Sequence, residues 1–344
     1  MTAVRGRCGN PKTMSALATS GDQPNPSSDL AEHGKARPSR RGWVPPHCLI
    51  MQTLAAVETT GQLPREQMPG ELTPQPVPER EVSPETGSQA PPRSTRPPEW
   101  VVEYSRGRRY PRRTQFDYLH LRRLLSCLEY VLTTLPHPVH DVVDIFCGTR
   151  PYDDLLPTGA RCVGLDIDER YGGADVVTTE FLPFEDASFD LAMCIQGFQY
   201  IEDPGHGVTE IARVLRPGGT ALVTTPLVGQ YNPDILEHRY TGPELKALFA
   251  DWDDVRIFDN GGRGISWALL TGSIIELREA ALPAPVRRAV WPLFSAAYLA
   301  VNSIGALIER GDERRPDGAE ILPVNLMLVA RRPTDGSSHP RPWR

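Results

Sequence analysis

The chain of 344 residues lacks several features that assign proteins to common classes. Its six cysteines never fall in C-x-x-C spacing, so neither a zinc site nor a disulfide framework is expected. The N-terminus has no apolar core behind its charges, unlike a secretory signal peptide. The formal net charge of −6 does not favour nucleic acid as a partner. These absences predict a cytoplasmic protein with reduced cysteines and no metal.

Proline and polar residues dominate residues 1–98, which hold 16 of the 35 prolines. The stretch Pro74-Gln-Pro-Val-Pro78 can sustain neither a helix nor a sheet. Because such composition cannot bury an apolar core, residues 1–98 are predicted to be a disordered leader. A docking role for its prolines is the alternative. The folded domain is expected at 99–333, followed by a disordered tail at 334–344.

From residue 99 onward, helical and strand patterns alternate. An amphipathic helix is predicted over 115–135, followed by helices at 204–215 and 241–250. Apolar, β-favouring runs predict strands at 139–146, 161–168, 174–179, 189–196, 220–225, 255–258 and 325–331. This alternation is typical of a doubly wound α/β sheet.

Residues 264–320 separate the last two predicted strands and are too many for a hairpin. They contain two helical patterns, at 267–281 and 286–309. The second includes 18 residues without charge, near the lower limit for a membrane span, but Pro292 and a polar face argue against one. A helical lid over the substrate is expected, and lipid contact flanked by Arg287 and Arg288 is left open.

Two strand ends carry the most informative motif, Asp144-Ile-Phe-Cys-Gly148 followed by Gly164-Leu-Asp166. A glycine lets the backbone turn sharply and approach a ligand, and a helix after the turn would offer N–H groups to an anion. An acidic residue at the end of the next strand suits the hydroxyls of a ribose. A nicotinamide dehydrogenase would need G-x-G-x-x-G, whereas this turn has one glycine.

Two further motifs follow in order, Leu182-Pro-Phe-Glu-Asp-Ala-Ser-Phe-Asp190 and Glu210-Ile-Ala-Arg213-Val-Leu-Arg-Pro-Gly-Gly219. Together the four motifs resemble the class I S-adenosylmethionine-dependent methyltransferases, type-11-like branch. The resemblance implies a Rossmann-like, seven-stranded, mostly parallel sheet with helices on both faces, a helical insertion before the last strand, and that strand antiparallel beside the sixth. It implies S-adenosyl-L-methionine as cofactor, bound by Asp144, Phe146, Cys147, Gly148, Asp166, Ile167, Leu182 and Gln196, with Asp190 as a further candidate.

Two departures from the family pattern bear on activity. Phe146 stands where the family usually has glycine, and Thr178 and Thr179 stand where an acidic residue is usual, with Glu180 next. A bulky Phe146 would narrow the crevice beside the methionyl group. These departures support a second hypothesis, a catalytically degenerate binding module that keeps the fold.

The expected function is methyl transfer to a small-molecule, glycan or lipid-linked acceptor. No catalytic base is assigned; His238, Tyr200 and Tyr240 are candidates, because the family builds acceptor contacts there. A run of five arginines at 106–113, with Tyr104 just before it and Tyr110 within it, is interpreted as a solvated cap over the pocket. A phosphorylated or acidic acceptor, a nucleic-acid contact and an anionic membrane surface are the alternatives. Peripheral membrane contact is left open, and the sequence predicts no oligomeric state.

Overall fold

A computed structural model describes residues 5–7, 99–178, 182–230, 235–313 and 322–334. The chain divides into two compact units, and the smaller, residues 44–96, lies wholly outside these ranges. Within the described part of the predicted leader, Arg5–Arg7 forms a strand, β1. The predictions for the rest of the leader and for 335–344 fall outside the described residues and stay predictions.

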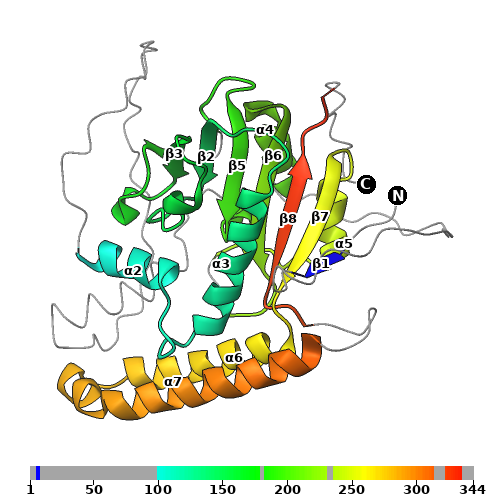
Figure 1. The fold of residues 1–344 in the computed structure, drawn as a ribbon. Coiled ribbons are helices and arrows are strands. Elements are labelled where there is room, and N and C mark those ends of the chain that lie inside the picture. Colours follow the sequence, from blue (N-terminus) through cyan, green and yellow to red (C-terminus); the bar gives the residue numbers. More distant parts are fainter. Residues whose placement is uncertain (1–4, 8–98, 179–181, 231–234, 314–321, 335–344) are drawn as a thin grey trace, which may run out of the picture. The chain divides into compact units, whose positions relative to one another are not determined.

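One mixed sheet forms the centre of the larger unit (Figure 1). Its order is β1-β7-β8-β6-β5-β2-β3-β4. The strands are β2 (Asp141–Ile145), β3 (Arg161–Asp166), β4 (Val176–Val177), β5 (Phe189–Ile195), β6 (Leu215–Pro226), β7 (Asp253–Asn260) and β8 (Asn325–Arg331). Strand β8 runs antiparallel between β6 and β7, as the family resemblance implied, and the other pairs are parallel. Strand β1 adds an eighth strand at the edge beside β7, beyond the seven predicted.

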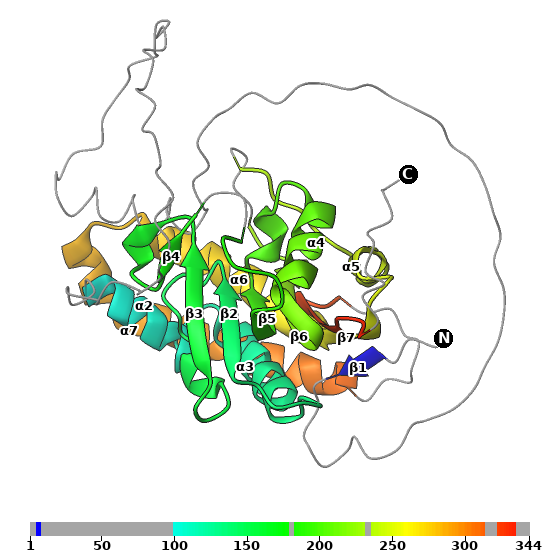
Figure 2. The same ribbon diagram turned by 90° about the horizontal axis from the view of Figure 1, so that it is seen from above.

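Helices cover both faces of the sheet (Figure 2). Helix α3 (Tyr118–Thr133) packs a leucine-rich stripe on one face, whose buried residues include Leu191, Met193 and Phe258. Helices α4 (Pro204–Val214) and α5 (Gly242–Leu248) pack on the other face, whose core includes Phe198 and Phe249. The capping box predicted for α5 is present, since Glu244 accepts hydrogen bonds from the Thr241 N–H at 2.7 Å and hydroxyl at 2.8 Å.

The expected helix after the Gly148 turn is absent, so that prediction was wrong. Only a three-residue 3₁₀ turn, η1 (Asp153–Leu155), lies between β2 and β3. Pro151 and Pro157 bracket this segment and leave too few residues for a helix. The turn therefore has no helix dipole behind it. Further 3₁₀ turns are η2 (Glu169–Tyr171) and η3 (Phe198–Tyr200).

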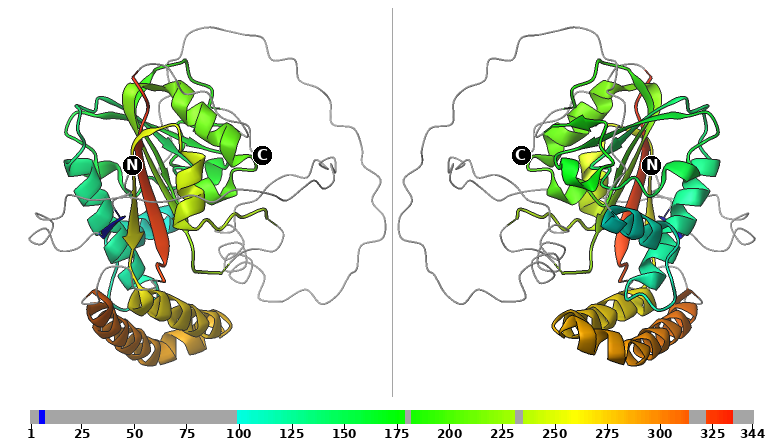
Figure 3. Two further views of the ribbon diagram at one scale, coloured as in Figure 1. Left: turned by 90° about the vertical axis from the view of Figure 1, so that its right-hand side faces the viewer. Right: turned by 90° about the vertical axis from the view of Figure 1, so that its left-hand side faces the viewer.

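Three more helices lie at the end of the sheet where the parallel strands finish, here called the C-terminal edge (Figures 1 and 3). Helix α2 (Glu99–Arg109) contains most of the arginine run, which was not predicted to be helical. Helices α6 (Arg263–Ala280) and α7 (Ala284–Glu313) form an antiparallel hairpin that fills the predicted insertion. The hairpin contacts the start of α3, because Gly272 and Gly305 lie close to Phe116 and Leu119 respectively.

The cysteines depart from one expectation. Cys147, Cys162 and Cys194 are free, and burial raises their pKa values, with the pKa of Cys162 reaching about 12. Cys127 in α3, however, is disulfide-bonded, so the prediction that all cysteines are reduced was wrong for it. Spacing along the chain does not reveal which cysteines meet in space.

Candidate functional site

The site is built from the ends of β2 and β3. Asp166, the last residue of β3, is buried and turned toward the Gly148 turn that follows β2. Its Oδ2 accepts the Gly148 N–H at 2.7 Å, and its Oδ1 accepts those of Ile167 at 2.8 Å and Asp168 at 3.2 Å. Burial raises the pKa of Asp166, and the backbone N–H groups oppose that rise. A carboxylate offers about four acceptor positions, so these three bonds leave Asp166 roughly one for a ligand.

The turn itself adopts an unusual backbone. Phe146, Gly148 and Arg150 all have positive φ, at 56°, 54° and 52°. A bulky residue in this region is strained, so the surrounding structure must hold Phe146 there. A Cβ built on Gly148 would meet nothing within 4 Å, whereas one built on Gly197 would lie 2.6 Å from the Cβ of Phe146. Open space therefore adjoins Gly148, and Phe146 packs against the turn after β5.

Arg150 locks the turn to the neighbouring strand. Its guanidinium contacts Asp175 at 2.6 Å, Asp153 at 2.9 Å and the Cys162 carbonyl at 3.0 Å. Asp175 Oδ2 also accepts the Gly164 N–H at 2.9 Å, and the Asp175 N–H donates to the Gly164 carbonyl at 2.7 Å. Because its side chain is largely buried and bonded to two carboxylates and a carbonyl, Arg150 fixes the turn without a ligand.

Asp144 and Cys147 lie buried beneath the turn. The pKa of Asp144 is raised to about 8, mainly by burial and also by the nearby Asp153 charge, while Arg150 opposes the rise. The free side chain is therefore largely protonated at neutral pH. A cationic ligand group beside Asp144 would favour the carboxylate.

A second cluster of polar side chains lies beside the end of β5, on the face of the sheet that α3 covers. Arg108 of α2 donates from Nη2 to Gln196 Oε1 at 2.6 Å and to the Tyr152 hydroxyl at 3.1 Å. Gln196 has a φ of 57°, and its Nε2 lies 2.9 Å from Nε2 of His120. The chain Arg108–Gln196–His120 thus joins α2, the end of β5 and α3. The interpretation of the arginine run as a solvated cap was wrong for Arg108, which is half-buried and bonded to Tyr152 and Gln196.

This chain of contacts sets the tautomer of His120. Because Gln196 Oε1 accepts from Arg108, its amide nitrogen faces His120 and donates to Nε2. The proton of neutral His120 then sits on Nδ1, which is buried without a hydrogen-bond partner among the described residues. Burial and the Arg108 charge lower the pKa of His120 to about 3, so it stays neutral.

The three acceptor-side candidates lie on the other side of the sheet. Tyr240 is buried in the core beside Phe198, with a ring distance of 5.8 Å, and burial raises its pKa. His238 stacks on Tyr240 at 5.6 Å and donates its N–H to the Gln199 carbonyl at 2.8 Å. Tyr200 in η3 is half-buried, and burial and the charge of Glu237 raise its pKa. The structure thus gives Tyr240 a packing role.

Leu182 is buried in the same core. Arg213 of α4 donates to the carbonyls of Leu182 and Phe184, each at 2.7 Å, and pairs with Glu210 at 2.9 Å. These bonds explain how the third and fourth motifs meet: the fourth holds the backbone of the third. Thr179 and Glu180 lie outside the described residues, so the prediction about the missing acid stays a prediction.

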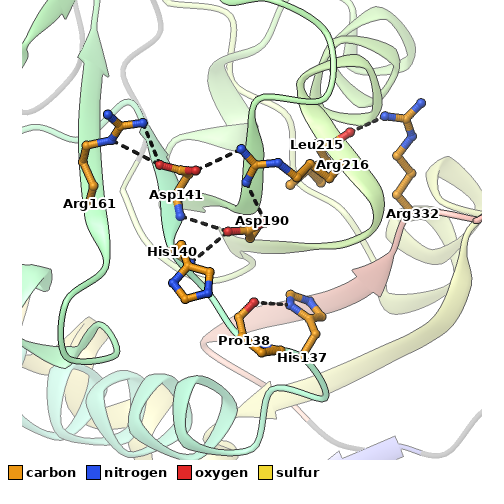
Figure 4. A network of polar contacts seen from close by, with 9 residues as sticks. All are labelled: His137, Pro138, His140, Asp141, Arg161, Asp190, Leu215, Arg216 and Arg332. Carbon is orange, nitrogen blue, oxygen red and sulfur yellow. Dashed lines mark hydrogen bonds and ion pairs between the residues drawn. The ribbon is translucent and has the colours of Figure 1, made fainter.

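Asp190 lies at the opposite edge of the sheet, where β2 and β5 begin (Figure 4). Its carboxylate accepts the backbone N–H groups of His140 at 2.8 Å and Asp141 at 3.0 Å and pairs with Arg216 at 2.7 Å. Arg216 also bonds Asp141 at 2.9 Å, and Arg161 bonds Asp141 at 2.7 Å. Naming Asp190 as a cofactor residue was therefore wrong; it fixes the start of two strands.

Sequence reasoning missed His120 and Tyr152, and it did not single out Arg108 among the five arginines. His120 lies within a helical apolar pattern, where a lone histidine carries no signal. Its link to Gln196 spans 76 positions and exists only once α3 has packed on the sheet. Among the described residues no cluster of three or more His, Cys, Asp or Glu could hold a metal.

Comparisons with known proteins show which family the chain resembles. Residues 143–223 match a family model described as a methyltransferase domain. A "Probable S-adenosylmethionine-dependent methyltransferase" of Mycobacterium tuberculosis is 34% identical over 218 residues, which cover 56% of this chain and 77% of the relative. A demethylmenaquinone methyltransferase of Corynebacterium kroppenstedtii is 29% identical over 180 residues, which cover 43% of this chain and 79% of the relative.

Among solved structures, a phosphoethanolamine N-methyltransferase of Haemonchus contortus is 16% identical with a TM-score of 0.37, covering 60% of this chain and 52% of that chain. The motifs at the ends of β2 and β3, the strand order and the relatives agree. The chain belongs to the class I S-adenosylmethionine-dependent methyltransferases.

Proposed function

We propose that the chain binds S-adenosylmethionine at the ends of β2, β3 and β5 and transfers its methyl group to a small apolar acceptor. The observation that carries this proposal is the buried Asp166 carboxylate bonded to the Gly148 turn, beside open space. The cofactor supplies a methyl group on a positively charged sulfur, so the carbon is already activated. The protein's share is to bind, orient and exclude water.

The turn residues fit the methionyl and ribose parts of the cofactor. Gly148 leaves room for a carboxylate where a side chain would stand. Asp144 offers a buried carboxyl that becomes charged beside an ammonium group. Asp166 retains about one acceptor position, which suits one ribose hydroxyl rather than the pair expected from the sequence.

The apolar residues of the site fit the adenine and the sulfur. Ile167 follows Asp166 directly, and Leu182 is buried with its backbone held by Arg213. These two side chains are proposed to flank the adenine. Phe146 and Cys147 shape the turn, and Gln196, fixed by Arg108 and His120, is proposed to face the methyl group.

The acceptor is proposed to be a small apolar molecule with a polar oxygen. Several relatives are demethylmenaquinone methyltransferases, which supports an acceptor of that kind over a glycan. His120 Nδ1–H is a buried donor without a partner, and such a donor favours a ligand that accepts from it. We assign His120 to orienting the acceptor oxygen. Tyr200 and His238 remain candidates for contact with the acceptor from the opposite side.

A second candidate function is a binding module without catalysis. The strained Phe146 beside Gly197 and the nearly saturated Asp166 favour it, because both reduce the room and hydrogen bonds left for the cofactor. The two functions make different predictions for turnover, although both allow binding.

Titration calorimetry with S-adenosylmethionine and with its demethylated product tests the proposal. Binding of both, followed by transfer of a labelled methyl group to demethylmenaquinol, is expected for the enzyme. Binding without transfer to any acceptor in a cell extract would favour the binding module. Failure to bind either compound would overturn the cofactor site.

The chain is proposed to act in the cytoplasm with peripheral contact to the membrane, where an apolar acceptor would reside. By length and composition, one helix among the described residues could cross a membrane, Ala284–Gly311 in α7.

A further inference from the structure

The α6–α7 hairpin exposes an unusual amount of apolar surface. Eleven of the sixteen exposed large hydrophobic side chains in the described residues lie on these two helices. Those used here to define the outer face are Trp267, Leu270, Ile274, Leu277, Leu293, Ile304 and Leu307. Leu293 and Leu307 are 71% and 68% exposed. Exposed apolar side chains gathered in this number on one hairpin mark an interaction site.

The spacing of these residues places the outer face along one side of each helix. On α6 its members recur at intervals of three and four residues, and on α7 Ile304 and Leu307 are three apart. The opposite side of α6 carries Gly264 and Ala268, packed against Gly305 of α7. Each helix thus has one packed side and one apolar side without a partner among the described residues.

The packed sides are fixed, so the hairpin cannot turn its outer face inward. A Cβ on Gly264 would overlap the Gly305 carbonyl oxygen, which leaves the helices in backbone contact. Glu309 of α7 accepts the Gly262 N–H at 2.7 Å and the Ile265 N–H at 3.2 Å at the start of α6. Asn302 donates to the carbonyls of Arg113 and Gln115, at 2.9 and 2.8 Å.

The same contacts exclude a membrane span by α7. A spanning helix would have to leave α6 and lose the bonds of Asn302 and the buried carboxylate of Glu309. Placing a carboxylate in lipid without those partners is strongly unfavourable. The outer face therefore meets a partner with the hairpin lying flat.

The charges select a membrane surface as that partner. No Asp, Glu, Lys, Arg or His lies between Arg288 and Glu309, and the exposed charges at the hairpin tip are arginines, Arg278 and Arg288, with Arg287 half-buried beside them. The acidic Glu279 nearby is engaged by the Tyr298 hydroxyl at 2.8 Å. An apolar face flanked by tryptophan and arginine suits the interface of an anionic bilayer.

We propose that the outer face docks in the plane of an anionic membrane, with the tip arginines against lipid phosphates. Because the hairpin lies at the C-terminal edge of the sheet, docking turns the candidate site toward the bilayer (Figures 1 and 3). This inference deepens the peripheral contact proposed above. It explains how an apolar acceptor could pass from lipid to the site without crossing water.

The test uses the full chain in a flotation assay with two kinds of vesicle, phosphatidylcholine alone and phosphatidylcholine mixed equally with phosphatidylglycerol. Wild type is expected to float with the anionic vesicles. The double variant Leu293→Gln/Leu307→Gln should bind at least about tenfold more weakly, because two exposed apolar side chains no longer enter the interface. The triple variant Arg278→Gln/Arg287→Gln/Arg288→Gln should lose the preference for anionic lipid.

The matched control is Val177→Gln/Leu236→Gln, two apolar side chains that are each 53% exposed but lie outside the hairpin. It should float like wild type. Circular dichroism checks that each variant is folded. No binding to either vesicle, or equal loss in the control, would overturn the inference.

Light scattering tests the alternative that the outer face binds a second copy of the chain instead of a membrane. A dimer that the Leu293→Gln/Leu307→Gln variant dissociates, without vesicle binding, would assign the outer face to a second copy and overturn the membrane proposal. Flotation needs neither cofactor nor acceptor, and calorimetry with the cofactor needs no vesicles. The docking surface and the methyl-transfer function can therefore fail separately.

Discussion

The two edges of the sheet use the same residue types for opposite purposes. At the edge where β2 and β5 begin, Asp141 and Asp190 are paired with Arg161 and Arg216 (Figure 4). At the C-terminal edge, Asp144 and Asp166 are buried, and burial raises the pKa of each. Although burial raises the pKa of Asp190 too, N–H groups and Arg216 bring it below its ordinary value. Paired carboxylates stabilise the starts of strands, whereas buried carboxylates with a raised pKa are typical of functional sites.

The largest effect is expected from Asp166→Asn. The amide keeps one acceptor oxygen but presents an NH₂ group toward N–H donors, so the turn loses charge-assisted hydrogen bonds. Affinity for S-adenosylmethionine should fall about 10- to 100-fold in titration calorimetry. The matched variant Asp190→Asn should lower the melting temperature and leave affinity unchanged. Equal loss of affinity in both would remove the distinction between the edges.

The next effect concerns pH. Because the pKa of Asp144 is raised from its ordinary value to about 8 on folding, the folded state holds a proton that the unfolded state has released. Stability should therefore fall as pH rises from about 4 to about 8, by an amount on the order of a few kcal/mol. Urea unfolding of Asp144→Asn, compared with wild type, should show a flatter profile and a stability gain that is largest at pH 8. An unchanged profile would contradict the raised pKa.

A smaller effect is expected from restoring the family glycine. Phe146→Gly removes the strain of a positive φ, worth about 1 to 3 kcal/mol, and frees space beside Gly197. Cofactor affinity should rise severalfold, with little net change in stability because packing is lost as strain is relieved. Arg150→Gly should instead lower stability, since Arg150 bonds two carboxylates and a carbonyl. Weaker cofactor binding by Phe146→Gly would mean that the ring contacts the ligand.

The smallest effect is expected at the edge of the sheet where β2 and β5 begin. Arg161 is mostly exposed, so its pair with Asp141 contributes about 0 to 1 kcal/mol. Thermal unfolding of Arg161→Gln should differ from wild type by at most a few degrees, and methyl transfer should not change. A large loss of activity would show that the two edges are coupled.

The sequence predicted the strands and helices that depend on local pattern. Asn325–Arg331 is observed as predicted, and α3 begins three residues later than expected. Apolar periodicity and proline positions suffice for such elements because they reflect burial on one side. The same reasoning predicted a helix after Gly148, which is absent because the segment between Pro151 and Pro157 is too short to form one.

The site was predictable only where a motif is contiguous. Asp144, Gly148 and Asp166 occupy neighbouring strand ends because β2 and β3 pair in parallel. Asp190 follows the same kind of pattern but starts its strand, so it lies at the wrong edge. His120 comes from a helix whose apolar stripe hides it, and only the packing of α3 on the sheet brings it to Gln196, which Arg108 of α2 contacts from the other side of the amide.

One consequence follows from the pairing of Asn260 with Asn325 at the ends of β7 and β8. The α6–α7 segment departs from the sheet and rejoins it at facing positions, so its length imposes no condition on strand register. A change in the length of this segment is therefore expected to leave the pairing of β7 with β8, and with it the ends of β2 and β3, unchanged.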